Sequence, residues 1–323
     1  MRRPRTWIAL AALAFATAAS AQGPYPSRSI RWIVPYTPGG ITDTVTRTIA
    51  QRVQDGLGQP IVIENKPGAN SIVGVEVVAK SPPDGYTVLT VIAAHAANAT
   101  LYAGKLPFDP VKSFTPVSLV ASAPLILTLN NNFPAKDARE FIAYAKANPG
   151  KISFGTSGIG SASHLTLELL QQTTGTTMVH VPYKGTGPAL TALIAGDIHM
   201  MVDVPSSMMP HVRAGKIRAI GMFSSKRVAS APEVPTVEEG GGPAIEGSTW
   251  VMFMTPAGTP REAVARLSAE VSKAIGSPDL RARFEQLGIE PLGTTPEQAA
   301  RFLDDEIAKW AKVITIAGVK PEQ

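Results

Sequence analysis

The chain has 323 residues, of which 44% are hydrophobic and 17% are charged, and it contains no cysteine. A chain of this length and apolar content can bury a large core and can divide into two domains. The absence of cysteine excludes disulfides, a lipid-anchored cysteine and thiol chemistry. The formal net charge is +5, or 5 − 3 = +2 without the three arginines among the first five residues. Because no basic block or basic and aromatic stripe remains, the composition argues against nucleic acid as a partner.

The first 21 residues have the pattern of a secretory signal peptide. A positive leader precedes an apolar run over residues 7–18, which is short for a membrane span, and Ala19-Ser20-Ala21 supplies the small residues of a cleavage site. We therefore predict cleavage between Ala21 and Gln22 and export to the periplasm. The alternative is an uncleaved anchor. No later segment has the length and apolarity of a membrane span.

The first structural signal is a glycine-rich turn between a strand and a helix. An apolar run over residues 30–36 leads into Thr37-Pro38-Gly39-Gly40, and a helix with apolar residues at helical spacing begins near Ile41. Glycine lets the backbone turn sharply and approach a ligand. The free amides and the positive end of the following helix attract an anion.

Strand and helix signals then alternate, which favours mostly parallel sheets. The predicted elements are a strand at 60–64, a loop at 65–71, a helix at 72–80, a turn at 81–85, a strand at 86–92, an apolar run at 119–130 with Pro124 inside it, and a helix at 135–147.

A second glycine-rich turn repeats the arrangement of the first. Lys151-Ile152-Ser153-Phe154 precedes a turn over residues 155–161, and a helix with an apolar face follows. Two such turns, in halves that both have α/β patterns, indicate two lobes that present helix N termini to one anion held between them.

The remaining signals complete the second lobe and return the chain to the first. We predict strands at 178–182, 198–204, 217–223 and 250–254, a loop at 183–187, and helices at 188–195, 261–275 and 296–316. Crossings near Pro124 and Trp250 would form a hinge. The predicted fold is α/β with two lobes and a cleft between them, divided into residues 22–123 and 251–323 of lobe I and residues 124–250 of lobe II.

Motifs along almost the whole chain resemble the receptors of tripartite tricarboxylate transporters, also called the Bug family of periplasmic solute-binding proteins. The matching stretches are Ile33-Val34-Pro35-Tyr36-Thr37-Pro38-Gly39-Gly40 with Asp43, Glu64-Asn65-Lys66-Pro67-Gly68-Ala69, Pro83-Asp84-Gly85-Tyr86-Thr87, Ala147-Asn148-Pro149-Gly150-Lys151, Gly155-Thr156-Ser157-Gly158 with Gly160-Ser161 and His164-Leu165, His180-Val181-Pro182-Tyr183-Lys184-Gly185, Val234-Pro235-Thr236, and Pro256-Ala257-Gly258-Thr259-Pro260. Their order and completeness carry the resemblance.

The resemblance implies a Venus-flytrap fold, similar to type II periplasmic binding proteins, without enzymatic activity, metal or cofactor. Such a receptor captures a small carboxylate, which could be a di- or tricarboxylate, an acidic amino acid or an aromatic carboxylate. It would act as a monomer and deliver the ligand to the permease subunits of a membrane transporter. A periplasmic sensor that passes ligand occupancy to a signalling partner is the alternative, because sequence does not distinguish the surfaces that the two partners would bind.

The resemblance also implies the site residues, because main-chain amides and ordered waters hold one carboxylate in this family. The first-lobe residues are Pro38, Gly39, Gly40, Ile41 and Asp43, and the second-lobe residues are Thr156, Ser157, Gly160, Ser161 and His164. For the far end of the ligand we expect Tyr183, Lys184 and Asp203. Five of these residues have a structural alternative: Asp43 suits the first turn of a helix, Ser161 suits a helix cap, His164 suits a packed position, and Tyr183 and Lys184 suit a solvated loop.

Two positions depart from the family pattern. Thr37 replaces an alanine, and Asn70-Ser71 replaces a common pair of glycines, which we expect to restrict that loop and to add polar groups at the rim of the cleft.

An enzyme is the weaker interpretation. Residues 155–159 begin like a nucleophile elbow around Ser157, but Ile159 stands where the last glycine is required. Gly158-Ile159-Gly160 is only part of a dinucleotide fingerprint, and His164 with Glu168 is a pair of residues and not a metal site.

Overall fold

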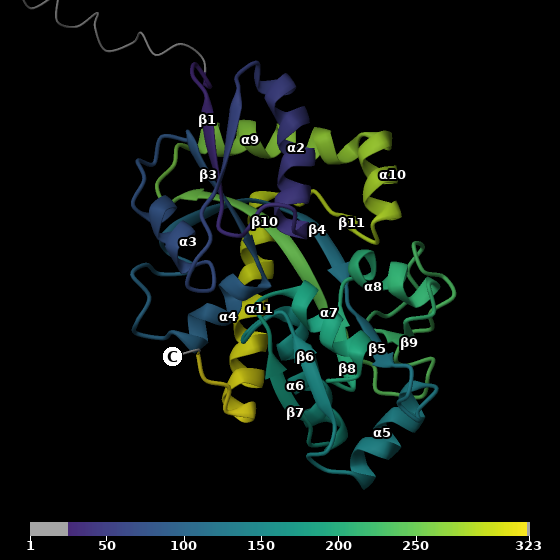
Figure 1. Ribbon diagram of the computed structural model, residues 1–323. Helices are drawn as coiled ribbons and strands as arrows, with labels where there is room; N and C mark the ends of the chain where they lie inside the picture. The colour runs from purple at the N-terminus through teal and green to yellow at the C-terminus, as the bar shows by residue number, and fades with distance from the viewer. Residues whose placement is uncertain (1–24, 322–323) are drawn as a thin grey trace, which may run out of the picture.

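The computed structural model describes residues 25–321, so the predicted signal peptide and its cleavage site lie outside the described residues. Two sheets form the cores of two lobes, one above the other in Figure 1. The six-stranded sheet of lobe I has the order β11-β4-β10-β3-β1-β2, and the five-stranded sheet of lobe II has the order β7-β6-β8-β5-β9.

The strands of lobe I are β1 (Ile30–Val34), β2 (Ile61–Asn65), β3 (Thr87–Ile92), β4 (Phe114–Pro124), β10 (Ser248–Pro256) and β11 (Glu290–Pro291). Strand β1 pairs in parallel with β2 and β3, whereas β10 is antiparallel to β3 and β4. The helices that belong to this part of the chain are α2 (Ile41–Leu57), α3 (Ile72–Ala79), α4 (Ala93–Leu101), α9 (Arg261–Gly276), α10 (Pro278–Gln286) and α11 (Pro296–Ala317).

The strands of lobe II are β5 (Ile126–Asn130), β6 (Ser153–Thr156), β7 (Val179–Pro182), β8 (Met200–Asp203) and β9 (Ile217–Met222). Strand β6 is parallel to β7 and β8, and β5 is antiparallel to β8 and β9. The helices are α5 (Ala138–Ala147), α6 (Ala162–Thr174), α7 (Thr186–Ala195) and α8 (Pro205–Arg213).

The chain passes between the two sheets at two adjacent points. It leaves β4 at Pro124 and enters β5 at Ile126, and it returns at Ser248, where β10 begins. Three backbone hydrogen bonds join these segments: Leu125 N donates to Gly247 O at 2.9 Å, Gly247 N donates to Phe223 O at 3.0 Å, and Phe223 N donates to Leu125 O at 2.8 Å. The two crossings therefore form one hydrogen-bonded unit at the base of both lobes.

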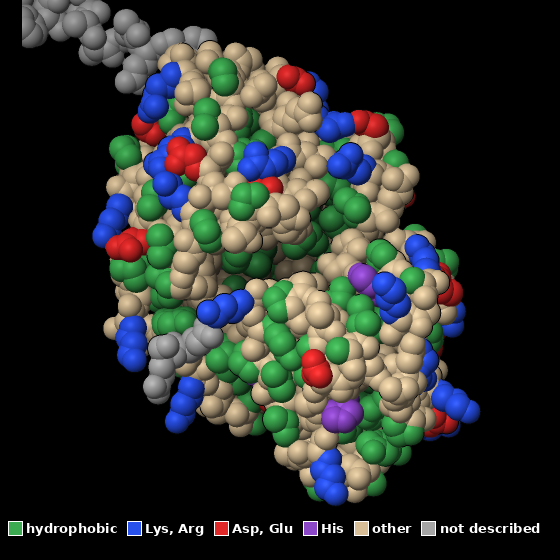
Figure 2. Space-filling model, viewed as in Figure 1, with side chains coloured by type: hydrophobic (Ala, Val, Ile, Leu, Met, Phe, Trp, Pro, Cys, Tyr) green, Lys and Arg blue, Asp and Glu red, His purple; other side chains and the backbone are tan. Residues whose placement is uncertain are grey.

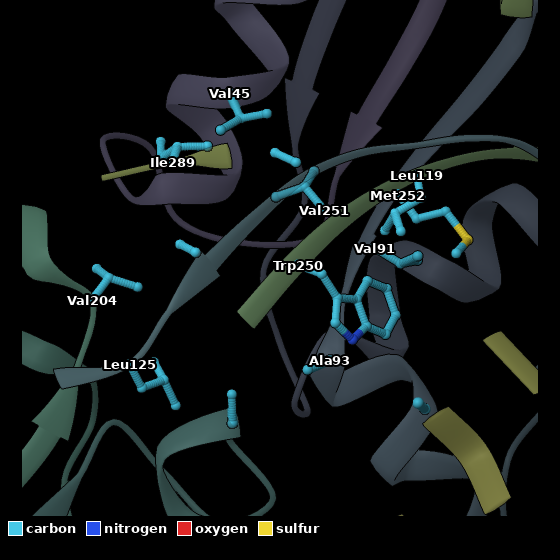
Figure 3. Packing of buried hydrophobic residues seen from close by; sticks show 14 of the residues in the cluster. Val45, Val91, Ala93, Leu119, Leu125, Val204, Trp250, Val251, Met252 and Ile289 are labelled. Atoms are coloured by element: carbon cyan, nitrogen blue, oxygen red, sulfur yellow. The ribbon is translucent and has the colours of Figure 1, made fainter. Parts of the chain in front are cut away.

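One hydrophobic core continues through this junction. Its buried residues come from both lobes, including Val45 and Trp250 of lobe I and Leu125 and Val204 of lobe II. Figure 3 shows Trp250 on β10, with its ring near Ala93, and Leu125 and Val204 on the side of the second sheet. A second, smaller cluster lies within lobe II, around Ile126, Leu193 and Met208.

Helix α11 packs on α4 and β4 of lobe I and also on α6 of lobe II. Its Glu306 is 8% exposed and accepts hydrogen bonds from two buried indoles, Trp250 Nε1 at 2.8 Å and Trp310 Nε1 at 2.7 Å. The Gln172 side chain of α6 donates to Val313 O at 3.0 Å. The last helix thus supports the return crossing and touches both lobes.

The prediction of a two-lobed α/β fold is confirmed, and three helices were not predicted. Helix α4 follows β3 without a loop, since β3 ends at Ile92 and α4 begins at Ala93. Helix α8 contains Pro210, and α10 is short and strongly charged. Helix α7 begins two residues before Pro188, at Thr186. Among the described residues, no helix has the length and apolarity needed to cross a membrane.

Candidate functional site

The two glycine-rich turns lie at the edges of the sheets that face each other. The first follows the carboxyl end of β1, and the second follows the carboxyl end of β6, whose neighbour β8 ends in the same direction at Asp203. Figure 1 shows the start of α2 at the edge of lobe I that faces lobe II. The space-filling view in Figure 2 is hollowed between the lobes at this level. In open α/β sheets this edge is where ligands bind.

The first turn leaves the N terminus of α2 open. Gly40 is the N-cap residue, so no side chain caps the helix, and Gly40 O accepts the first helical bond from Thr44 N at 2.9 Å. The amides of Gly40, Ile41 and Thr42 have no hydrogen-bond partner among residues 25–321. Pro38, Gly39 and Gly40 are exposed, and Ile41 is half-buried. These amides are therefore available to an anion at the positive end of the helix.

Asp43 supports the first turn from within lobe I. Its carboxylate accepts hydrogen bonds from Gly39 N at 3.0 Å, from Arg47 Nε at 2.9 Å and from Asn65 Nδ2 at 2.9 Å. Burial alone would raise the pKa of Asp43, but the hydrogen bonds from Arg47, Gly39 and Asn65 hold it below its ordinary value. The carboxylate therefore stays ionised and ties the turn to α2 and to the end of β2.

The loop before α3 adopts a left-handed backbone at three successive residues that are not glycine. The φ angles are 43° at Ala69, 50° at Asn70 and 76° at Ser71. Each such residue stores strain, which is commonly found at functional sites. This loop therefore keeps a backbone conformation that glycine would adopt without strain, although these residues are not glycine. Asn70 Nδ2 donates to Asn98 Oδ1 at 2.8 Å, and Asn98 Nδ2 donates to Asn70 O at 2.8 Å, so α4 holds the loop in place.

The second turn carries its own cap. Ser161 accepts from His164 N at 3.3 Å as the N-cap of α6, and its amide donates to Gly158 O at 3.3 Å. Thr156 is fully buried, and its hydroxyl bonds to Gly158 within the turn. The amides of Ala162 and Ser163 have no partner within the described range. The second helix N terminus thus offers fewer free amides than the first.

The hydroxyl of Ser157 lies half-buried in this turn. It makes no hydrogen bond to a histidine or a carboxylate among residues 25–321.

Two histidines lie beneath the second turn. His164 is 3% exposed, and its Nδ1 accepts from Gly160 N at 3.1 Å. Its ring stacks on the ring of His180, with centroids 3.8 Å apart, and His180 Nε2 lies 2.7 Å from Thr156 Oγ1. His180 was not among the predicted site residues. Its place depends on the pairing of Phe154 with His180 across β6 and β7, which no sequence spacing reveals.

Gly160 brings the second turn against lobe I. A Cβ atom at this position would lie 2.5 Å from Leu101 Cδ1 of α4 and 3.8 Å from Asn70 Nδ2. A larger residue here would require the Leu101 side chain to move, and the φ angle of 74° favours glycine. The second turn therefore meets α4 and the loop before α3 across the cleft.

The three residues expected at the far end of the ligand lie in different environments. Tyr183 is half-buried and packs over Gly155, whereas Lys184 is exposed. Asp203 is 7% exposed and accepts from Thr186 Oγ1 and from Val204 N, both at 2.7 Å. Burial raises the pKa of Asp203, and these two hydrogen bonds offset part of that effect. Asp203 thus anchors the start of α7 beside the end of β6.

A separate cavity of about 610 Å³ lies behind the crossings. It is lined by residues after β9, by α10 and β11, and by Pro124 and Ser248 of the crossings. Strands β11 and β9 flank the crossings on the side away from β1 and β6. None of the predicted site residues lines this cavity.

Uncapped amides at a helix N terminus, two facing turns and a hinge of two strands define the class of protein. It is a two-lobed solute-binding protein whose cleft is suited to an anion. Within the described range, no group of three or more histidine, aspartate or glutamate side chains could hold a metal ion.

Comparisons with known proteins place the chain within this class. The family model described as "Tripartite tricarboxylate transporter family receptor" matches residues 45–319. The chain is 37% identical over 314 residues to the UPF0065 protein in the tcbD-tcbE intergenic region of Pseudomonas sp. (strain P51), covering 97% of this chain and 93% of the relative. It is 36% identical over 301 residues to Protein BugT of Bordetella pertussis (strain Tohama I), covering 92% of this chain and 91% of BugT. The chain belongs to the family of tripartite tricarboxylate transporter receptors, as its motifs predict.

Two solved structures show the same fold with bound ligands. R. palustris Rpa4515 with adipate has a TM-score of 0.83 and 34% identity and covers 92% of this chain and 100% of its own. MatC (Rpa3494) from Rhodopseudomonas palustris with bound malate has a TM-score of 0.77 and 36% identity and covers 90% of this chain and 100% of its own. The family and these structures indicate a periplasmic solute-binding protein.

Proposed function

We propose that the protein captures a small dicarboxylate in the cleft between its lobes and delivers it to the permease subunits of a tripartite tricarboxylate transporter. The observation that carries the proposal is the open N terminus of α2, where Gly40, Ile41 and Thr42 present unpartnered amides and no side chain caps the helix. A carboxylate placed there accepts charge-assisted hydrogen bonds and interacts favourably with the helix dipole.

The second turn supports the same carboxylate from lobe II. Its helix α6 contributes the free amides of Ala162 and Ser163, and ordered waters can bridge the remaining distance at modest cost. Because the two turns belong to different lobes, an anion bound by both stabilises the closed arrangement. We propose that the lobes close about the crossings at residues 124–126 and 247–248, with lobe II spanning residues 124–250.

The relatives support a dicarboxylate as the ligand class. One structure contains adipate and the other contains malate, which differ in length and in hydroxylation. The main-chain amides of the two turns bind only one carboxylate, so they would hold either molecule in the same way. The side chains near Asp203 and Tyr183 would set the length and polarity of the far end. We also propose that residues 1–21 are removed during export to the periplasm.

A substitution at Gly40 directly tests whether the carboxylate binds at the N terminus of α2. An aspartate at an N-cap position accepts from the amides of the first turn. Gly40 has φ −73° and ψ 173°, which any residue adopts, and a Cβ there would have only Thr37 O at 4.0 Å as a neighbour. Gly40→Asp therefore places a carboxylate of the protein where the ligand carboxylate would bind.

We expect Gly40→Asp to lose at least tenfold in affinity for adipate or malate by calorimetry, with a melting temperature equal to or above that of the wild type. Gly276→Ala is the matched control, because that glycine has no atom near a built Cβ and lies at the end of α9. Unchanged affinity in Gly40→Asp would place the ligand carboxylate elsewhere.

A further inference from the structure

The second glycine-rich turn rests on a buried stack of three rings. Phe154 and His180 are opposite each other on β6 and β7, with ring centroids 4.9 Å apart and planes 18° apart. His164 of α6 lies on the other face of His180, with centroids 3.8 Å apart and planes 17° apart. Two imidazoles at this separation disfavour a charge on both rings at once.

The hydrogen bonds of His164 determine its tautomer. Gly160 N can only donate, so His164 Nδ1 accepts and carries no proton. The proton of the neutral ring is therefore on Nε2, which lies 3.5 Å from Glu168 Oε1. An additional proton can bind only to Nδ1, where it would face the Gly160 N–H. Protonation of His164 and the hydrogen bond to Gly160 thus exclude each other.

His180 holds the other end of the same turn. Its Nε2 lies 2.7 Å from Thr156 Oγ1, and that hydroxyl also bonds to the backbone of Gly158. Burial, together with the neighbouring His164, lowers the pKa of His180 to about 3. His180 therefore stays neutral in mild acid. Among residues 25–321, the titratable groups in contact with the His164 ring are Glu168 on its own helix and His180 on β7.

The hydrogen bond from the Gly160 amide connects the two histidines, His164 and His180, to the cleft. Gly160 sits where lobe II meets Leu101 and Asn70 of lobe I, and Ser161 follows it as the cap of α6. Loss of the bond between Gly160 and His164 frees the turn immediately before the amides of Ala162 and Ser163. The turn would then no longer be held in the shape that meets lobe I.

We propose that His164 and His180 are positioning residues of the second turn and that uptake of one proton by His164 releases Gly160 and weakens ligand binding. This inference rests on the proposed function, because the ligand is the carboxylate held between the two turns. Neither ring needs to touch the ligand. Acidification would favour release, and neutral pH would favour capture.

Two variants test the roles of the two histidines in holding the turn. Asparagine places an oxygen at the position of Nδ1, so His164→Asn keeps the acceptor for Gly160 N and cannot take up a proton in this range. His180→Phe keeps an aromatic ring in the stack but removes the partner of Thr156. His211→Asn, a half-buried residue of α8, is the control for a histidine outside the stack.

The test measures the affinity for adipate and malate by calorimetry at several values between pH 7.5 and pH 5. The wild type and His211→Asn should lose about tenfold in affinity over this range. His164→Asn should show only the pH dependence of the ligand itself, whatever its affinity at pH 7.5. His180→Phe should bind more weakly at every pH and retain the wild-type dependence. Identical pH profiles for the wild type and His164→Asn would overturn the inference.

A readout without ligand distinguishes this inference from the proposed function. In ¹H–¹⁵N spectra of the free protein, the Gly160 amide resonance should shift with the same midpoint as the His164 ring and should not titrate in His164→Asn. A Gly160 amide resonance whose chemical shift does not change when His164 is protonated would refute the inference, even if a carboxylate binds. Absence of carboxylate binding at every pH would instead refute the proposed function.

Discussion

The buried carboxylate of Glu306 offers the sharpest stability prediction. One oxygen, Oε2, accepts from both Trp250 Nε1 and Trp310 Nε1, and the two indoles are 1% and 0% exposed. The other oxygen, Oε1, lies 3.2 Å from Lys309 Nζ. In Glu306→Ala both indole N–H groups lose their partner inside the core. Each unsatisfied buried donor costs about 1–3 kcal/mol, so for the two donors we expect a loss of about 2–6 kcal/mol in the free energy of unfolding.

Glu306→Gln is the matched variant. The side-chain carbonyl of glutamine can take the place of Oε2 and accept from both indoles, although hydrogen bonds to a neutral acceptor are weaker than those to a carboxylate. We therefore expect Glu306→Gln to lose about 1–2 kcal/mol. Asp304→Ala, on the exposed face of α11, should change the stability by less than about 0.5 kcal/mol.

Urea unfolding followed by circular dichroism measures these losses without relying on tryptophan fluorescence, which the substitution itself alters. The midpoint and the slope should be reported together, because a changed slope would indicate a changed unfolding transition. The reasoning would be refuted by a loss of less than about 1 kcal/mol in Glu306→Ala, or by equal losses in the alanine and glutamine variants.

Two other predictions follow from buried groups at the cleft and in lobe I. His95 is 1% exposed, and burial lowers its pKa from 6.5 to about 4. The unfolded chain therefore binds the proton more tightly than the folded chain. The contribution of neutral His95 to the free energy of unfolding is complete above pH 6.5 and falls by up to about 1.4 kcal/mol per pH unit between pH 6.5 and pH 4. His95→Gln should remove this component from the pH dependence of thermal unfolding, and an unchanged slope would contradict the assignment. Gly160→Ala should weaken ligand binding by at least tenfold in calorimetry, because its methyl group would lie 2.5 Å from Leu101 Cδ1 and at a φ of 74°. Adding Leu101→Ala should restore part of the affinity, and no recovery would indicate that the backbone angle alone is responsible.

The sequence predicted the parts of the structure that local patterns control. The glycine turn before α2 and the helix that begins at Ile41 are confirmed, since glycine and helical periodicity act over a few residues. The polar cap of α6 at Ser161 is confirmed for the same reason. The helix α4 was not predicted, because the alanine-rich segment from Ala93 gives little amphipathic signal and follows a strand without a turn.

The support of the site depends on contacts that are distant in sequence. Asp43 can be placed in the first turn of a helix from the sequence, but its bond to Asn65 requires the pairing of β1 with β2. The stack of His164 on His180 likewise requires the register of β6 and β7. The left-handed backbone at Ala69 and Ser71 is opposed by local preference, and Asn98 of another helix holds Asn70 between them. Tertiary contacts decide each of these features.

The most direct test of the proposed receptor function is a thermal-shift titration of residues 22–323 with adipate and malate, alongside adipamide and malamide as neutral controls. A ligand at a hundred times its dissociation constant stabilises the native state by about 2.7 kcal/mol, which moves the melting temperature measurably. The proposal predicts that at least one dicarboxylate raises the melting temperature and that its diamide does not. Stabilisation by the diamide equal to that by the dicarboxylate, or no response to any dicarboxylate, would contradict a cleft that binds a carboxylate through its helix amides.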